Sequence, residues 1–253
     1  MTDSAGVAER EIVAVTGAGR GIGAAIVWEL ARRGFTAAAL TRSGAGPEAP
    51  PEEPELAGRL LTLRADVTDE ASLAAAFADL AGRGGLAGLV NNAGTHHVGA
   101  SEDFASADFE RVLAINATGV FVACREAFPH LAARGGGTIV NIGSFFDRMG
   151  VPHNTAYTAS KAAVAAITRC LAVEWAPRNI RVVNVAPGYI ETDLNREFLS
   201  NPKSRDYIAQ RVPLRRPGSP EEVARLVGAL FREDIPYLTG ETIYLDGGHG
   251  IAH

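Results

Sequence analysis

Apolar positions along this chain fall into two alternating patterns. Short apolar runs bounded by turn residues are typical of buried strands, and they occur at 11–16, 36–41, 60–63, 86–91, 138–144, 181–185 and 242–245. Apolar residues that recur at helical spacing are typical of amphipathic helices, and they occur at 24–33, at 69–81, around 104–133, through Tyr157 and around 220–231. The pattern therefore predicts strands and helices that follow one another along the chain.

This alternation predicts an α/β fold. Helical crossovers between successive strands produce parallel pairing with right-handed connections. We expect a single-domain, Rossmann-like doubly wound parallel sheet with helices on both faces. A chain of 253 residues that is 47% hydrophobic can bury a substantial core, whereas two full domains would be cramped. Residues 1–253 are therefore interpreted as one domain.

Two segments interrupt the alternation. Residues 43–54 are too rich in proline and glycine to form a helix over most of their length, so we expect a long exposed loop and a much shortened crossover helix there. Residues 187–217 are polar and punctuated by prolines. Since they follow a strand at the presumed binding edge, the part from 189 to 217 is predicted to be a mobile lid.

Net charge limits the classes of ligand that the sequence predicts, and the cysteines bear on the cellular compartment. The net charge of −5, without a basic stripe, disfavours nucleic acid and anionic membranes and favours a small-molecule ligand. Cys124 and Cys170 lie far apart in helical patterns, as expected of reduced thiols in the cytoplasm. Residues 1–10 do not resemble a signal peptide, and no apolar run is judged long enough to span a membrane. We expect a soluble cytoplasmic protein.

A glycine-dense turn joins the first predicted strand to the first predicted helix. Unhindered backbone next to a helix N-terminus forms an anion site suited to a pyrophosphate. Because a strand precedes the turn and a helix follows it, nucleotide binding is favoured over a merely tight turn. The residues expected to bind are Gly17, Gly19, Arg20, Gly21, Ile22 and Gly23.

The end of the second strand bears on the choice of nucleotide. A carboxylate that binds a ribose 2′-hydroxyl is expected about 20 residues after the glycine turn, but Arg42 occupies that region and the nearest downstream carboxylate is Glu48. Arg42 and Arg20 could bracket a 2′-phosphate with charge-assisted hydrogen bonds. The sequence therefore favours NADP(H) over NAD(H), unless both arginines are simply solvated surface groups.

Tyr157 and Lys161 lie four residues apart in an Ala-rich helical run, so their side chains share one helix face. A free tyrosine has a pKa of about 10 and needs a nearby cation to exchange protons near neutrality. Lys161 is placed to lower that pKa, although the pair could also lie on a solvated helix surface. Ser144 ends a buried strand at the edge where ligands bind in open α/β sheets, so the serine and the tyrosine can meet across one crevice.

These motifs together resemble the short-chain dehydrogenase/reductase family, in its compact single-domain form, over nearly the whole chain. The segments that carry the resemblance are Thr16-Gly-x-x-x-Gly21-x-Gly23, Asn91-Asn-Ala-Gly94, Asn116, Ser144 with Tyr157-x-x-x-Lys161, Pro187-Gly-Tyr-Ile-Glu-Thr192 and 238–248. This sequence departs from the family at Gly143, where a second serine is common, and in the proline-rich stretch 44–54.

The resemblance implies roles for individual residues. Tyr157 would be the general acid, Ser144 would hold the substrate oxygen, Lys161 would bind the nicotinamide ribose, and Asn116 would carry a water that extends the proton relay. Cofactor contacts would come from Asp66, Val67, Asn92, Ala93, Gly94, Pro187, Gly188, Ile190 and Thr192, in addition to Tyr157 and Lys161. Asp66 could instead cap a turn, and Asn116 could be a satisfied buried amide.

Residues near Ser144 and the loop histidines are the candidate substrate contacts. Phe145 and Phe146 follow Ser144 and could form an apolar wall, although core packing explains at least one of them equally well. His96 and His153 lie in loops expected to rim the same mouth. The adjacent pair His96 and His97 lacks the spacing of zinc ligands, so no metal site is expected.

The sequence thus favours an NADP(H)-dependent oxidoreductase that interconverts a ketone and a secondary alcohol. The main alternative is a 3-oxoacyl-thioester reductase with an acyl carrier protein or CoA, for which Arg134 and Arg178 could supply local basic contacts. A non-catalytic NADP(H)-sensing regulator is disfavoured, because a sensor does not need Ser144, Tyr157 and Lys161. Apolar helix surfaces around 104–133 and at Tyr157 predict a homotetramer or homodimer.

Overall fold

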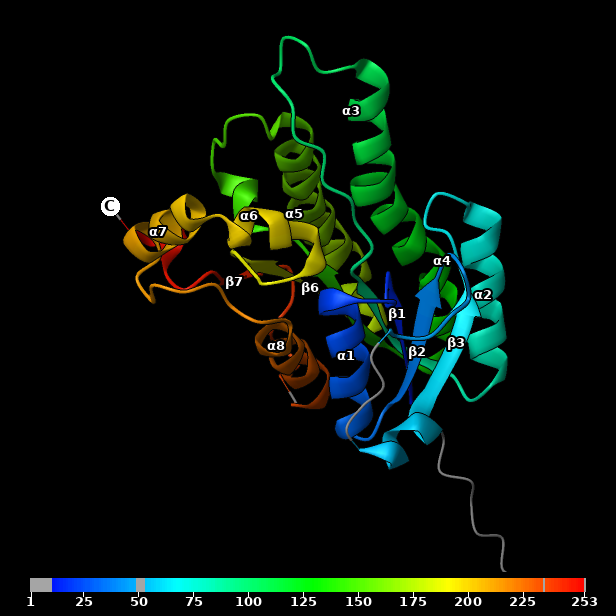
Figure 1. Ribbon diagram of the computed structural model, residues 1–253. Coiled ribbons are helices and arrows are strands. Elements are labelled where there is room, and N and C mark those ends of the chain that lie inside the picture. Colours follow the sequence, from blue (N-terminus) through cyan, green and yellow to red (C-terminus); the bar gives the residue numbers. More distant parts are fainter. Residues whose placement is uncertain (1–10, 49–52, 234, 253) are drawn as a thin grey trace, which may run out of the picture.

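The computed structural model describes residues 11–48, 53–233 and 235–252, which include a seven-stranded parallel sheet (Figure 1). The spatial order of its strands is β3-β2-β1-β4-β5-β6-β7, the order of a doubly wound sheet, so the predicted fold class is confirmed. The strands are β1 (Ile12–Thr16), β2 (Thr36–Thr41), β3 (Leu60–Arg64), β4 (Leu86–Asn91), β5 (Gly137–Ile142), β6 (Ile180–Pro187) and β7 (Thr242–Leu245).

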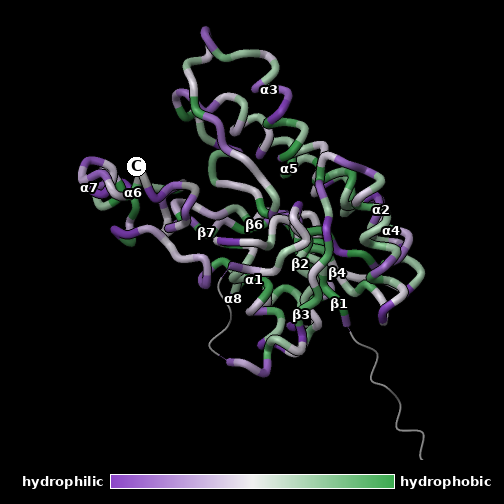
Figure 2. The backbone as a smooth tube through the Cα atoms, turned by 45° about the vertical axis from the view of Figure 1, so that its right-hand side comes forward, coloured by the Kyte–Doolittle hydropathy of each residue, from purple (hydrophilic) through white to green (hydrophobic). Residues whose placement is uncertain are grey.

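Helices cover both faces of the sheet. They are α1 (Gly21–Arg32), α2 (Glu70–Gly82), α3 (Ser106–Leu113), α4 (Gly119–Arg134), α5 (Thr155–Trp175), α6 (Arg196–Ser200), α7 (Pro202–Arg211) and α8 (Pro220–Arg232). Ile12 and Ala14 belong to a core that includes α2, α4 and α5, whereas Val13 and Val15 belong to a core that includes α1 and α8. Successive strand residues point to opposite faces, so each run is apolar throughout. Figure 2 shows the green, hydrophobic segments gathered around the strands.

The first strand marks the point where the winding reverses. β1 pairs with β2 on one side and with β4 on the other, so the chain moves outward to β3 and then returns past β1. In such sheets ligands bind beyond the carboxyl ends of the strands at this reversal. The glycine turn that follows β1 therefore lies at the binding edge.

The long helix predicted around 104–133 is interrupted. A π-helical turn at Ala114–Thr118 separates α3 from α4, and Asn116 lies inside it. The helical stretch Ser106–Arg134 is 29 residues long and, by length and composition alone, could cross a membrane. The expectation that no apolar run reaches that length was therefore wrong. Val120, Ala123, Cys124, Ala127 and Leu131 of α4 belong instead to the core beside the sheet, where the helix packs on β4 and β5.

The helix in the proline-rich crossover is much shortened, as predicted. Its described part is a 3₁₀ helix of six residues, Pro54–Arg59, and residues 49–52 lie outside the described residues. The loop before it folds back toward the first strand, because Thr41 Oγ1 donates to Ala45 O at 2.8 Å and Glu48 N donates to Gly19 O at 2.8 Å. The second strand crossover thus lies beside the glycine turn.

The segment predicted as an irregular lid contains two short helices, α6 and α7, which stand apart from the sheet in Figure 1. Leu199, Ile208 and Val212 form a small buried cluster there, with Tyr189 packed against it. Pro202 stands at the first position of α7, where a proline starts a helix rather than preventing one. The mobility of this segment remains a prediction.

Candidate active site

The glycine turn is packed tightly against the end of β4. Gly17 has φ +63°, and a Cβ there would lie 2.7 Å from Ala93 Cα. A Cβ on Gly23 would lie 2.4 Å from Gly17 O and 2.5 Å from Asn92 Nδ2. Asn92 Nδ2 itself donates to Thr16 O at 3.1 Å and to Gly17 O at 3.0 Å. Two motifs about 75 residues apart therefore form one surface.

Other glycines in the turn are not required by the protein's own packing. The nearest atom to a Cβ on Gly19 would be Thr41 Cγ2 at 3.7 Å, an ordinary contact. Arg20, at the start of α1, has extended backbone and makes no side-chain cap. The first N–H groups of α1 are therefore left without a side-chain acceptor. Small residues that leave open space at an uncapped helix start fit a bound phosphate group.

Arg20 and Arg42 are both exposed at this edge. Within the described parts of the chain, neither side chain makes a hydrogen bond or salt bridge. Asp66 does cap a turn, because its Oδ1 accepts from Thr68 N at 2.9 Å and from Thr68 Oγ1 at 2.7 Å. These bonds, followed by the charges of Arg42 and Arg64, hold the pKa of Asp66 below its usual value. Arg42 therefore lies close enough to Asp66 for its charge to act on the carboxylate.

The segment after β6 approaches the same turn from the other side. Pro187 is buried, and Gly188 lies so close to β7 that a Cβ there would be 2.7 Å from Asp246 Cα. Ile190 forms a parallel bridge with Gly218. The Thr192 methyl would be 3.5 Å from a Cβ on Gly21. The predicted cofactor residues after β6 thus face the glycine turn across the carboxyl edge.

Tyr157, Ser144 and Lys161 lie together beside this turn. Ser144 follows β5 at the start of a 3₁₀ turn, and its hydroxyl lies close enough to the Tyr157 phenol to act on the pKa of that phenol. Lys161 Nζ lies 5.6 Å from the centre of the Tyr157 ring and donates to Ile142 O at 2.8 Å. A Cβ on Gly94 would be 3.9 Å from Lys161 Nζ, so the end of β4 adjoins the lysine. The structure thus brings these three side chains together, as the sequence predicted.

Burial controls the acid-base properties of this group. Desolvation raises the pKa of Tyr157, and the Ser144 hydroxyl only partly opposes it. Desolvation also lowers the pKa of Lys161 to about 8. The expectation that Lys161 lowers the tyrosine pKa was therefore wrong for this structure. The physical reason is that desolvation dominates the tyrosine pKa, while the ammonium donates its hydrogen bond to Ile142 O.

Asn116 is fully buried in the π-helical turn. Its Oδ1 accepts from Thr95 N at 2.8 Å, and its Nδ2 donates to Thr95 O at 2.9 Å and to Ser160 Oγ at 3.1 Å. Its amide is thus satisfied by the protein, and Oδ1 would lie 3.4 Å from a Cβ on Gly94. A π-helical turn opens a gap in the helix ladder and is common at functional sites, so a structural role does not exclude a role in the site.

The predicted substrate residues separate into two groups. His96 contacts Tyr157 with ring centres 4.6 Å apart, and Phe146 meets the same ring edge-on at 5.9 Å. Phe145 is buried behind Phe146. His153 is exposed with φ +64°, and its hydrogen bond within the described residues is a backbone one, from Gly99 N to His153 O. The geometry therefore brings His96 and Phe146 to Tyr157, with Phe145 packed on Phe146, but it does not bring the His153 side chain there.

Several residues near the site carried no recognisable signal in the sequence. Tyr189, Tyr207 and His249 extend the ring contacts of Phe145 and Phe146 into an aromatic cluster from four distant segments. His249 is presented by a turn in which Asp246 accepts from Gly248 N and Gly250 N. A C-terminal histidine in a Gly-rich tail looks like a solvated residue, so only tertiary structure reveals it.

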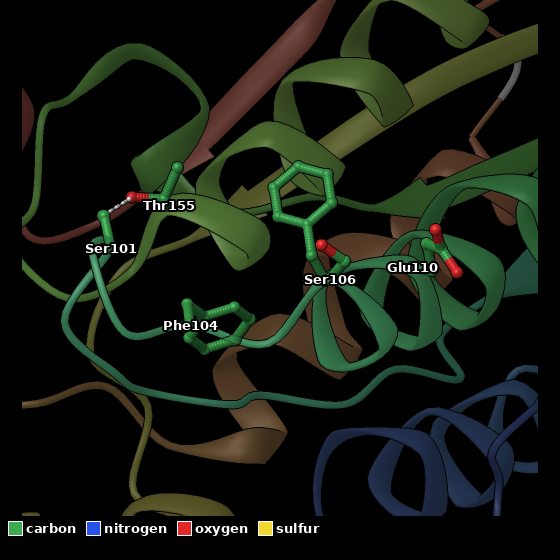
Figure 3. A pocket seen from close by; sticks show the side chains of 6 residues that line it. Ser101, Phe104, Ser106, Glu110 and Thr155 are labelled. Atoms are coloured by element: carbon green, nitrogen blue, oxygen red, sulfur yellow. Dashed lines mark hydrogen bonds between the residues drawn. The ribbon is translucent and has the colours of Figure 1, made fainter.

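A surface cavity of about 380 Å³ lies between the start of α5 and the start of α3 (Figure 3). Ser101 and Thr155 are joined at its rim by a 2.7 Å hydrogen bond between their hydroxyls. Its lining residues are Ser101, Phe104, Ser106, Phe109, Glu110 and Thr155. Within residues 11–48, 53–233 and 235–252, no three His, Cys, Asp or Glu side chains are grouped to hold a metal ion.

Known proteins resemble this chain over nearly its whole length. Residues 17–250 match the family model described as "Enoyl-(Acyl carrier protein) reductase". A 2-(R)-hydroxypropyl-CoM dehydrogenase of Xanthobacter autotrophicus is 36% identical over 244 residues, which cover 94% of this chain and 98% of the relative. A glucose 1-dehydrogenase of Gluconobacter oxydans is 38% identical over 240 residues, covering 93% and 90%.

Solved structures give the same result. The crystal structure of a gluconate 5-dehydrogenase from Burkholderia cenocepacia, in complex with NADP and tartrate, superposes with a TM-score of 0.87 at 29% identity and covers 96% of each chain. With the strand order, the glycine turn and the family match in agreement, the chain belongs to the short-chain dehydrogenase/reductase family, whose members are oxidoreductases that use nicotinamide cofactors.

Proposed function

We propose that this chain is an NADP(H)-dependent oxidoreductase that interconverts a ketone and a secondary alcohol. The observation that carries the proposal is the closeness of the Ser144 and Tyr157 hydroxyls, with the Lys161 ammonium buried beside the tyrosine ring, at the sheet edge that also holds the glycine turn. The relatives with alcohol substrates in their names support the same reaction class.

The residues present fit a nicotinamide dinucleotide. The glycine turn and the uncapped start of α1 would hold the phosphates, Asn92 to Gly94 would line the ribose side, and Ile190 with Thr192 would hold the carboxamide. Asp66 and Val67 would contact the adenine. Exposed Arg20 and Arg42, without salt bridges among the described residues, would bind a 2′-phosphate, which supports NADP(H) over NAD(H).

When bound, the nicotinamide supplies a hydride to the carbonyl carbon or accepts one from the alcohol. Ser144 donates its hydrogen bond to the substrate oxygen and so orients the carbonyl. Tyr157 gives its phenolic proton to that oxygen during reduction and takes it back during oxidation. Lys161 would bind the nicotinamide ribose through its ammonium, which lies 5.6 Å from the centre of the Tyr157 ring. Asn116 would hold a water through which the proton returns to solvent.

The proposal is tested by a cofactor-consumption screen of ketones, sugars, steroids and thioesters with NADPH and NADH. The wild type should reduce at least one ketone, and Tyr157→Phe should lower kcat/KM by about 10²- to 10⁴-fold, the usual contribution of general acid catalysis. NADPH binding, followed by fluorescence, should remain. Unchanged turnover in Tyr157→Phe would refute the relay, and equal or better kcat/KM with NADH would refute the cofactor preference.

A 3-oxoacyl-thioester substrate is the second candidate, favoured by the description of the matching family model. One of the basic residues considered for carrier docking is engaged, because Arg134 pairs with Glu11 at 2.9 Å. Turnover of an acetoacetyl thioester without turnover of simple ketones would select this alternative.

A further inference from the structure

The Tyr157 ring is held between two other rings. His96 lies on one side with ring centres 4.6 Å apart, and Phe146 approaches edge-on at 5.9 Å. Phe146 is buried, whereas His96 is only partly buried. His96 is therefore the polar neighbour of Tyr157 that solvent, and hence a substrate, can reach.

Asn154 fixes how the His96 ring is oriented. Its Nδ2 donates to Pro152 O at 2.7 Å, so its Oδ1 faces His96 Nε2 at 2.5 Å. Because Oδ1 can only accept, Nε2 must carry the proton of this hydrogen bond. In the neutral imidazole the other nitrogen, Nδ1, is then left as an acceptor. Asn154 is buried, so this arrangement is held by the fold rather than by a mobile surface group.

His96 Nδ1 has no partner within the described residues. His249 Nδ1 is fully buried without a partner, whereas His96 Nδ1 is accessible to solvent. The neighbouring histidine differs, because His97 lies against Phe104 and beside Asp108 and Arg111. One of the two adjacent histidines is thus engaged with α3, while the other presents an open acceptor next to the Tyr157 ring.

We propose that His96 is a specificity-determining residue that accepts a hydrogen bond from a second hydroxyl on the carbon next to the reacting one, so that the preferred substrates are α-hydroxy ketones and vicinal diols. This inference rests on the proposed function, because Tyr157 and Ser144 must hold the reacting oxygen. An acceptor beside the Tyr157 ring then meets groups attached close to the reacting carbon. A site built to pair a substrate hydroxyl discriminates against the analogue that lacks it.

The test compares matched ketones that differ by one hydroxyl, beginning with acetoin and 2-butanone and extending to 2-hydroxycyclohexanone and cyclohexanone. Each is assayed for kcat and KM with NADPH. The wild type should favour the hydroxy ketone by about tenfold in kcat/KM, the factor expected for one hydrogen bond. His96→Phe should abolish this preference by raising KM for the hydroxy ketone, with little change for the plain ketone.

Three further variants separate specificity from folding. His97→Phe changes the adjacent histidine and should retain the preference. His96→Gln can still reach Asn154 but places no acceptor at the Nδ1 position, so it should lose the preference. His96→Asn places an amide oxygen near that position and should keep part of it.

The outcomes distinguish this inference from the proposed function. Wild-type enzyme that reduces plain and hydroxylated ketones equally, or His96→Phe that keeps the preference, overturns the role of His96 alone. Failure of the wild type to reduce any ketone in either series removes the proposed function as well.

Discussion

Lys161 is an ammonium held almost completely out of water. Its side chain is 5% exposed, and its hydrogen bond among the described residues is to Ile142 O. Burial lowers its pKa from 10.5 to about 8, which corresponds to a cost of about 3 kcal/mol for the charged form at neutral pH. The folded protein thus contains a destabilising buried charge at the position where the proposed reaction needs a positive charge.

Replacing Lys161 should therefore stabilise the protein while abolishing its activity. In Lys161→Met, removal of the desolvation cost should outweigh the lost hydrogen bond, which is worth about 1 kcal/mol, and raise the free energy of unfolding by about 1–2 kcal/mol at pH 7. Chemical denaturation measures this difference, and the ketone assay measures the activity.

The pH dependence of the same variant has a definite sign. Below pH 8 the lysine is charged in both states, so the folded wild type bears the whole cost. Between pH 8 and 10.5 the folded protein binds fewer protons than the unfolded chain, and wild-type stability from this residue rises with pH. The advantage of Lys161→Met should shrink over that window, and an advantage that stays constant to pH 10 would contradict the assigned cause.

At the residue scale, the sequence predicts which side chains meet better than it predicts their pKa values and hydrogen-bond partners. The spacing of Tyr157 and Lys161 and the strand before Ser144 were sufficient to place these groups together. Burial then set the tyrosine pKa in the direction opposite to the expectation, because desolvation depends on packing from distant segments. The same limit applies to His96 and His97, which are adjacent in the sequence but have partners in different segments, Asn154 before α5 and Arg111 in α3.

Two glycines of the glycine turn differ in whether the protein's own packing requires them. Gly23 is required by packing against Gly17 and Asn92, whereas Gly19 has only an ordinary contact with Thr41. Gly23→Ala should lower the melting temperature, because a Cβ at 2.4 Å from a carbonyl oxygen forces the turn apart. Gly19→Ala should fold normally.

The matched pair is measured by thermal unfolding and by NADPH titration. Gly19→Ala should weaken NADPH binding about tenfold or more without a change in melting temperature, since its methyl group would fill the space expected for the phosphates. Equal affinity in wild type and Gly19→Ala would show that this part of the turn does not approach the cofactor.

The observed element boundaries show which helices and strands the apolar pattern can predict and which it cannot. β2, β4 and β7 were predicted with their observed bounds, because turn residues flank each short apolar run. The region 187–217 was not predicted as helical, since α7 is polar and its few apolar residues serve only a small local cluster. The π-helical turn also escaped prediction, because one extra residue in a helix leaves the apolar spacing nearly unchanged.

The whole molecule leaves apolar side chains uncovered on its outer helices. Phe121 on α4 is 40% exposed and Val173 on α5 is 79% exposed. We expect these helices to associate in a homodimer or homotetramer, as the apolar helix surfaces predict. Light scattering at micromolar concentration should give a multiple of 26.5 kDa.

A charge in this surface should weaken the association. The double variant Phe121→Asp with Val173→Asp should shift the scattering mass toward the monomer while retaining the far-UV circular dichroism of the wild type. A wild type that is monomeric at micromolar concentration would contradict the expected assembly.

The extra residue in the turn Ala114–Thr118 also limits how the gene for this protein can change. Deleting one codon there would close the π-helical turn into an uninterrupted α-helix, and α3 and α4 would keep their orientation because the wider turn is what absorbs the extra residue. Asn116 would lose its bonds to Thr95, whereas the apolar residues of α4 would stay in the core. A deletion-scanning library should therefore show that one-residue deletions over these five residues retain folding but lose activity.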